Sequence, residues 1–158
     1  MAIYVKYGSI NGAVTTTGYD KWIEVNSFQW GVGRGIGSAA RGDANREGSE
    51  PSLSEITVTK AMDVASVKLI QDAWGGELNN KVDIKFTSTT KNGVVDYLTY
   101  SLENVGLSGY SISSGGDQPS ESLSLNFTKI TITFKGLDPA TSGSPISANY
   151  DLTKMKGG

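Results

Sequence analysis

The sequence predicts a mainly β protein in which two antiparallel sheets form a partly closed β-barrel or sandwich, with one flanking α-helix and a long extended loop. Two observations carry this prediction. Most segments alternate apolar and polar residues with a period of two, as antiparallel strands with one buried face do. One segment alone has helical spacing. The 158 residues suit a single domain, 1–158.

The alternating segments give the expected strands. In chain order they are Ala2–Tyr7, Asp20–Trp30, Leu53–Lys60, Lys81–Ser88, Val95–Asn104, Val105–Ser113, residues 123–134 and Ile146–Leu152.

Two of these strands change parity along their length. In residues 20–30 the apolar side chains switch from one face of an extended chain to the other, and a β-bulge near residues 26–27 would reconcile them. The same switch in residues 123–134 predicts a second bulge near residues 128–129.

The segment MDVASVKLIQDAWGG predicts an amphipathic helix over about residues 64–74. The stripe expected to face the core consists of Val67, Ile70 and Trp74. The opposite, solvated face is expected to carry Lys68, Gln71 and Asp72. Such a face usually meets only solvent.

The stretch WGVGRGIGSAARGDANREGSEPS has no periodicity and predicts a long extended loop over residues 31–52. A dinucleotide-binding fingerprint fails there, because the sixth position counted from Gly31 is Ile36. We interpret the RGD triplet at residues 41–43 as a coincidence. A loop of this length is either disordered or functional, and composition alone favours disorder. The functional interpretation is an arm that docks on a partner.

Composition excludes several kinds of site. Cysteine and histidine are both absent, which removes disulfides, thiolate chemistry, the Ser-His-Asp relay and metals bound by either residue. We therefore expect no catalytic residue, cofactor or metal. The net charge of −2 favours neither nucleic acid nor an anionic membrane as a partner. No apolar run approaches a spanning helix, and the N-terminus lacks a signal-peptide pattern.

The chain resembles the hemolysin-coregulated protein family (Hcp), whose members form the tube of the bacterial type VI secretion system. The matching pieces keep their order over nearly the whole chain, with the glycine-rich loop after the first of them. They are KWIEVNSFQWG (Lys21–Gly31), ITVTKAMDVASVKL (Ile56–Leu69), YSLENVGLSGYSISS (Tyr100–Ser114), ESLSLNFTKITITF (Glu121–Phe134) and ANYDL (Ala148–Leu152).

The resemblance implies a homohexameric ring with a wide channel, and rings that stack into a tube. It also implies a contractile sheath, a baseplate and a VgrG-type spike as partners, together with secreted effectors carried in the lumen. The protein would assemble in the cytoplasm and then leave the cell without a cleaved signal peptide.

The same resemblance assigns roles to the loop and to the helix. The loop would reach onto neighbouring subunits, with its charged residues setting the register. These expected contact residues are Arg34, Arg41, Asp43, Arg46, Glu47 and Glu50. The helix would help to line the channel, and the lumen-facing residues would be Lys68, Gln71 and Asp72.

Three alternatives stay open. A carboxylate-based hydrolase would need two acids roughly 5–9 Å apart, but the acids are dispersed along the chain. A monomeric carbohydrate-binding β-sandwich could use the tryptophans and tyrosines as a stacking platform, although aromatic residues in alternating strands are more often core. A phage-type tail tube subunit would share the architecture and serve a different machine.

Overall fold

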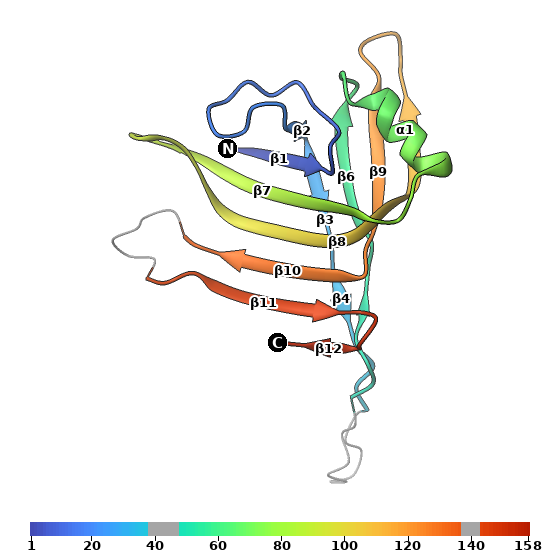
Figure 1. Ribbon diagram of the computed structural model, residues 1–158, viewed down its shortest axis with the longest axis vertical. Helices are drawn as coiled ribbons and strands as arrows, with labels where there is room; N and C mark the ends of the chain where they lie inside the picture. The colour runs from blue at the N-terminus through green and yellow to red at the C-terminus, as the bar shows by residue number, and fades with distance from the viewer. Residues whose placement is uncertain (38–47, 137–142) are drawn as a thin grey trace.

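The computed structural model describes residues 1–37, 48–136 and 143–158. These residues form two main antiparallel sheets with one helix, α1 (Ser66–Gly75), on their flank (Figure 1). The predicted fold class, mainly β with two antiparallel sheets and a flanking helix, is confirmed. In the described residues the sheets do not close into a barrel.

The sheets share strand β8. The large sheet runs in the order β12 (Lys156–Gly157), β11 (Ile146–Asp151), β10 (Lys129–Phe134), β8 (Gly93–Ser113), β7 (Asn80–Thr90), β1 (Ala2–Tyr7) and β2 (Ile23–Val25). The small sheet consists of β3 (Ser27–Gln29), β6 (Ile56–Ala61), β9 (Ser120–Asn126) and the second half of β8. A separate two-stranded sheet pairs β4 (Val32–Gly33) with β5 (Ser52–Leu53).

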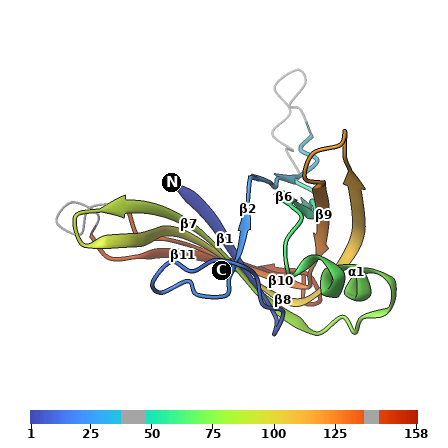
Figure 2. The ribbon, with the colours of Figure 1, turned by 90° about the horizontal axis from the view of Figure 1, so that it is seen from above.

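The chain passes between the two main sheets four times. One passage runs through α1, from β6 to β7, and the other three join the sheets in a corner (Figure 2). At Asn26 it leaves β2, which pairs with β1, and enters β3, which pairs with β6. β8 crosses within one strand at Asn104, whose φ of 54° turns the backbone there. Residues 127–128 lead from β9 in the small sheet to β10 in the large one.

These crossings explain the parity changes in the sequence. The bulges predicted near residues 26–27 and 128–129 are wrong, because at both places one strand ends and another begins in the other sheet. Both sheets face a shared core in the corner, so a strand that changes sheets must also change the parity of its buried residues. The predicted strands Val95–Asn104 and Val105–Ser113 are one continuous β8.

The core lies between the two sheets and beneath α1, which contributes the fully buried Leu69. Burying such apolar side chains is the dominant favourable term in folding. The buried side chains of the core are Val5, Tyr7, Ile23, Val25, Ile56, Val58, Ala65, Leu69, Val82, Ile84, Leu102, Val105, Leu107, Leu123, Leu125, Phe127 and Ile130.

A smaller cluster forms where residues 8–22 fold over the other face of the large sheet (Figure 2). The rings of Tyr4 and Tyr19 lie 5.0 Å apart, and Val14 packs with them. The Tyr19 hydroxyl donates to Asp96 at 2.9 Å. This loop therefore covers part of that face, with contacts to β1 and β8.

Leu69→Ala is expected to destabilise the protein by about 2–5 kcal/mol, because it leaves a cavity beneath α1. Val67→Ala, on the exposed side of the same helix, is the matched control and should change stability by no more than about 0.5 kcal/mol. Urea unfolding of both variants measures the difference. Equal losses at the two positions would contradict the observed orientation of α1.

Candidate functional site

The two limbs of the predicted loop form a paired stalk at its base. Next to the β4–β5 pair, the N–H of Ser54 donates to the Gly31 carbonyl at 2.9 Å, and the N–H of Gly31 donates to Ser54 Oγ at 2.9 Å. Further out, Ser49 and Gly35 repeat this arrangement, with the Ser49 N–H 2.8 Å from the Gly35 carbonyl. The stalk, described here for residues 31–37 and 48–54, projects from the end of the molecule opposite α1 (Figure 1).

Two of the six charged residues expected in subunit contacts lie on this stalk. Arg34 and Glu50 are both exposed. The guanidinium of Arg34 lies over Gly48, where an added Cβ would come within 3.0 Å of Arg34 Cζ. Glycine at this position therefore lets the arginine lie along the opposite limb. The other four residues lie outside the described part of the chain: Arg41, Asp43, Arg46 and Glu47.

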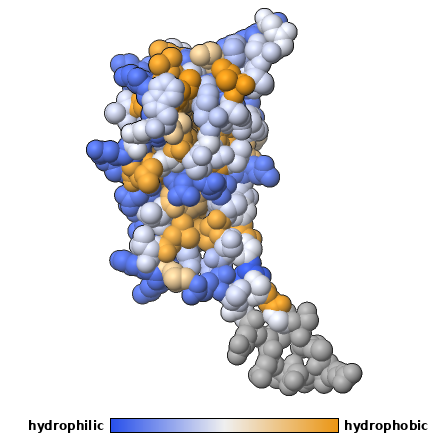
Figure 3. Space-filling model, turned by 90° about the vertical axis from the view of Figure 1, so that its right-hand side faces the viewer, coloured by the Kyte–Doolittle hydropathy of each residue, from blue (hydrophilic) through white to orange (hydrophobic). Residues whose placement is uncertain are grey.

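An apolar recess of about 200 Å³ lies where the stalk meets the large sheet. Its lining residues are Trp30, Val32, Pro51, Leu53, Ile130, Ile132, Ala148, Asn149 and Tyr150. On the side of the molecule drawn in Figure 3, apolar surface extends toward the stalk. An open apolar recess beside exposed charged residues has the composition of a protein contact surface.

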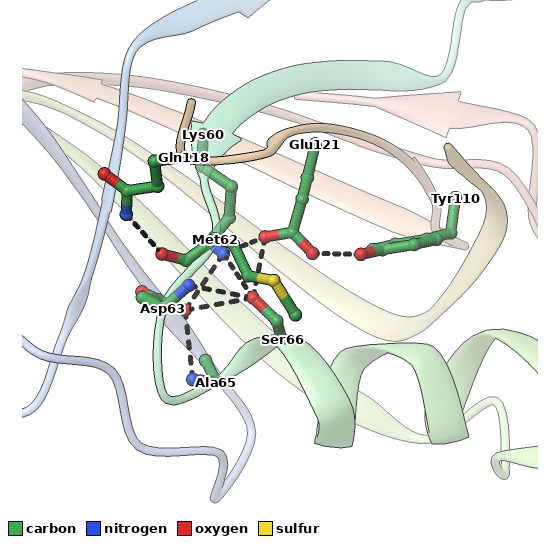
Figure 4. A network of polar contacts seen from close by, with 8 residues as sticks. All are labelled: Lys60, Met62, Asp63, Ala65, Ser66, Tyr110, Gln118 and Glu121. Carbon is green, nitrogen blue, oxygen red and sulfur yellow. Dashed lines mark hydrogen bonds and ion pairs between the residues drawn. The ribbon is translucent and has the colours of Figure 1, made fainter. Parts of the chain in front are cut away.

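A buried polar network holds the start of α1 against the small sheet (Figure 4). Lys60 and Glu121 face each other on the paired strands β6 and β9, with Nζ and Oε1 2.5 Å apart and both side chains fully buried. Lys60 also contacts Asp63 at 2.9 Å and donates to Ser66 Oγ at 3.1 Å. The hydroxyls of Ser66 and Tyr110 donate to Glu121, Ser66 at 2.7 Å. The buried ammonium thus has an acceptor for each of its three donors.

The turn that leads into α1 is tied down by its backbone as well. The N–H of Met62 donates to the Pro119 carbonyl at 3.0 Å. Gln118 Nε2 donates to the Met62 carbonyl at 2.7 Å, as Figure 4 shows. Asp63 Oδ1 accepts from the N–H of Ala65 at 3.0 Å. The turn between β6 and α1 is therefore joined to the turn between β8 and β9.

The network shifts the pKa of its acidic groups. Burial on its own raises the pKa of Glu121, but hydrogen bonds from Lys60, Tyr110 and Ser66, with the charge of Lys60, outweigh burial and lower this pKa below the ordinary 4.5. Burial, and then the hydrogen bond to Glu121, raise the pKa of Tyr110 above its ordinary 10.0. Glu121 is therefore ionised and Tyr110 protonated at neutral pH.

The polar network sets the rotation of α1, and the predicted core stripe is wrong. Ser66 and Leu69 face the body and are fully buried, whereas Val67 and Trp74 are 61% and 77% exposed. The predicted stripe assumed that the apolar face turns inward. The Ser66 hydroxyl is bound to the buried pair of Lys60 and Glu121, so this polar side chain decides which face of α1 is buried. Leu69 is the apolar residue buried on the same face. Ile70 is partly buried.

Asp72 also lies on the inward side of the helix. Its carboxylate accepts hydrogen bonds from the Tyr7 hydroxyl at 2.5 Å and from Asn80 Nδ2 at 3.1 Å. It therefore anchors the second turn of α1 to β1 and β7 and does not share a face with Lys68 and Gln71, which are both exposed. That these two residues face a channel stays a prediction.

Sequence reasoning missed Lys60 and Glu121, although the sequence contained a signal. Lys60 shares the parity of the buried Ile56 and Val58, and Glu121 shares that of Leu123. One cation and one anion, each on the apolar side of a strand, indicate a buried pair, since an isolated buried charge is strongly disfavoured.

The described residues contain no group of three or more His, Cys, Asp or Glu side chains placed to hold a metal ion. Among the same residues, no helix is long and apolar enough to span a membrane.

One family model and several solved structures match this chain. A family model described as "Type VI secretion system effector, Hcp" matches residues 4–134. A solved structure of a type six secretion system protein is 27% identical, covers 99% of both chains and has a TM-score of 0.88. Hcp1 from Salmonella typhimurium is 19% identical over 99% of this chain and 97% of its own, with a TM-score of 0.76.

A type VI secretion system effector from Yersinia pestis is 20% identical, covers 94% of this chain and 98% of its own, and has a TM-score of 0.74. A search of curated protein sequences found no match. The fold and the candidate site define the class of the protein. It is a β protein with two sheets joined in a corner, a flanking helix and a projecting hairpin stalk. Because the family model matches most of its length, the chain belongs to the Hcp family of type VI secretion system proteins.

Glu121→Gln is expected to destabilise the protein by about 3–5 kcal/mol, because it leaves the Lys60 ammonium buried without its anion. The double variant Lys60→Met, Glu121→Leu is the matched control and should lose far less, since it removes both charges. Urea unfolding at pH 7 measures both.

The same comparison should depend on pH. Folding lowers the pKa of the Glu121 carboxyl below its unfolded value of 4.5. The stability that this carboxylate contributes is therefore complete above pH 4.5, and it is lost as the pH falls through the lower pKa of the folded state. The stability gap between wild type and Glu121→Gln should therefore shrink below pH 4.5. A gap that stays constant from pH 7 down to 3 would contradict an ionised Glu121.

Proposed function

We propose that this chain is the tube subunit of a type VI secretion system and forms six-membered rings that stack into a hollow tube. Membership of the Hcp family supports this proposal. The structural observation that carries it is the projecting stalk with an open apolar recess at its base. A protein that acts as a monomer would gain nothing from either feature. Both features suit contact with further copies of the chain.

The placement of these features fits assembly from head to tail. Such assembly joins two different surfaces of each subunit and closes into a ring when the rotation between copies closes; rings then stack through their two remaining, unlike faces. The stalk and the recess lie at one end of the long axis, and α1 with the turn between β8 and β9 lies at the other (Figure 1). Two unlike ends of this kind meet when subunits stack along the axis.

In this proposal the glycine-rich residues 31–52 form the assembly arm. Glycine loses more conformational freedom on ordering than other residues do, so docking such a segment costs free energy. An extensive contact offsets the cost, and we expect an interface near or above roughly 1,600 Å² in total. Arg34 and Glu50 are exposed on the stalk and are available to pair with charges on a neighbouring subunit.

The further partners are those of the secretion machine. They are the VgrG-type spike, the contractile sheath, the baseplate and the secreted effectors. The tube assembles in the cytoplasm and leaves the cell with the spike, and the chain acts as a structural component without catalysis. The exposed Lys68 and Gln71 of α1 are proposed to face the channel and to contact effectors.

Deleting residues 39–47 is expected to leave a folded domain, because β4, β5 and the core lie outside the deletion, and to weaken ring closure or stacking. Circular dichroism and negative-stain electron microscopy measure the two properties. Lys91→Glu, at an exposed turn far from the stalk along the sheet, is the control and should assemble as the wild type does. Undiminished assembly of the deletion variant would refute the arm assignment.

Charge reversal at Lys68 is expected to lower the amount of effector that copurifies with the tube by severalfold, while the unfolding midpoint stays unchanged because the side chain is exposed. Lys91→Glu makes the same charge change elsewhere and serves as the control. Quantitative mass spectrometry of purified tubes gives the ratio. Equal retention by the two variants would argue against a channel role for Lys68.

A further inference from the structure

The sequence contains two Asn-Gly pairs, Asn11-Gly12 and Asn92-Gly93, and the structure places them in opposite surroundings. Asparagine is among the chemically labile residues. Its side-chain amide carbon lies within reach of the next backbone nitrogen, and a following glycine leaves that nitrogen unhindered because glycine has no Cβ. Both pairs therefore have the sequence in which asparagine most readily loses its side-chain amide. Which of the two reacts depends on the fold around it.

The first pair is held by close packing. Gly12 is buried, and its N–H donates to the Lys21 carbonyl at 2.8 Å. A Cβ added at Gly12 would lie 2.2 Å from the Trp22 carbonyl oxygen and 2.8 Å from Ile23 Cα, so other backbone surrounds this glycine closely. A reaction at the Gly12 nitrogen would have to break its hydrogen bond and displace these atoms. The folded structure therefore protects Asn11.

The second pair lies in the turn between β7 and β8, at the end of that hairpin far from α1 (Figure 1). Asn92 and Gly93 are both exposed. Within the described part of the chain, a Cβ added at Gly93 would meet no heavy atom within 4 Å. The Thr90 hydroxyl donates to the Gly93 carbonyl at 3.0 Å and accepts from the Asn92 N–H at 3.3 Å, so it holds backbone and not the Asn92 side chain. Thr90 and Gly93 form the last pair of the ladder, and such end pairs open locally at little cost in free energy.

We propose that Asn92 is a site of spontaneous covalent modification in the folded protein and that Asn11 is not. The Gly93 backbone nitrogen loses its proton and attacks the side-chain carbon Cγ of Asn92. A C–N bond forms, the bond from Cγ to Nδ2 breaks, and Nδ2 takes up a proton and leaves as ammonia. Water then adds to either carbonyl of the resulting five-membered imide and opens it. The products are aspartate and isoaspartate, and the reaction needs no oxidant, reductant or enzyme.

The modification changes the charge at the end of the hairpin. Asn92 lies beside Lys91 on the wall of a cleft of about 940 Å³, which Asp96 and Lys135 also line. Asp96 and Lys135 already pair with each other, with Oδ2 and Nζ 3.2 Å apart, so the exposed Lys91 is available to the new carboxylate. Each modified chain carries one more negative charge at this cleft. The modified fraction rises with the time since synthesis, so a long-lived assembly of these chains becomes mixed in charge at this surface.

The test follows both asparagines in the same molecules. The full-length protein is incubated at physiological temperature and mildly alkaline pH, which favours loss of the Gly93 amide proton. Peptide mapping by mass spectrometry detects each event as a gain of about one dalton, and chromatography separates aspartate from isoaspartate. A sample unfolded in guanidinium chloride is incubated in parallel, because unfolding removes the difference in surroundings between the two pairs. Asn92→Gln is the control variant, since its longer side chain would have to close a six-membered ring.

In the folded protein, Asn92 should be converted at least about tenfold faster than Asn11, because the exposed turn opens locally far more often than the buried loop does. In guanidinium chloride the two should react at similar rates. Anion exchange of the folded protein should show a more acidic species that grows with time and that Asn92→Gln does not form. Equal conversion of the two asparagines in the folded protein, or an intact Asn92 there after the unfolded chain has reacted fully, would overturn the inference. The reaction does not depend on ring formation, so either result leaves the proposed function standing.

Discussion

The structure depends on the buried ion pair between Lys60 and Glu121. Removing two charges from water costs several kcal/mol for each ion, and the cost is offset here because the two residues face each other on paired strands and Ser66, Asp63 and Tyr110 satisfy the remaining donors and acceptors. This geometry joins β6, β8, β9 and α1 at one point. It therefore decides the path of the turn into α1 and the face that the helix buries.

The orientation of α1 and the corner between the sheets together decide which surfaces are available for contacts. Because β8 belongs to both sheets, the core is enclosed in the corner, and the stalk and α1 emerge at opposite ends (Figures 1 and 2). The apolar recess lies at the end with the stalk, and the exposed Val67 and Trp74 of α1 lie at the other. A subunit with different surfaces at its two ends has the geometry that assembly from head to tail requires.

The period of the apolar residues was sufficient to predict the longer strands, the single helix and the fold class, but not the short strands β4, β5 and β12. It did not predict the crossings between sheets. The alternation shows which side of a strand is buried, but it does not show which strand lies beside it. It also placed Trp74 in the core, because pattern reasoning turns the apolar face of a helix inward, whereas Ser66 and Asp72 set the rotation here. Of the expected contact residues, Arg34 and Glu50 lie exposed on the stalk, and their contacts stay predictions because these depend on other copies of the chain.

The central claim is that this subunit covers its recess and stalk by joining other copies of itself. Sedimentation velocity of the purified full-length chain over a wide range of concentrations tests it most directly. The account predicts a species with the mass of six 16.7-kDa chains that grows at the expense of the monomer as concentration rises. A single 16.7-kDa species at every concentration would contradict it.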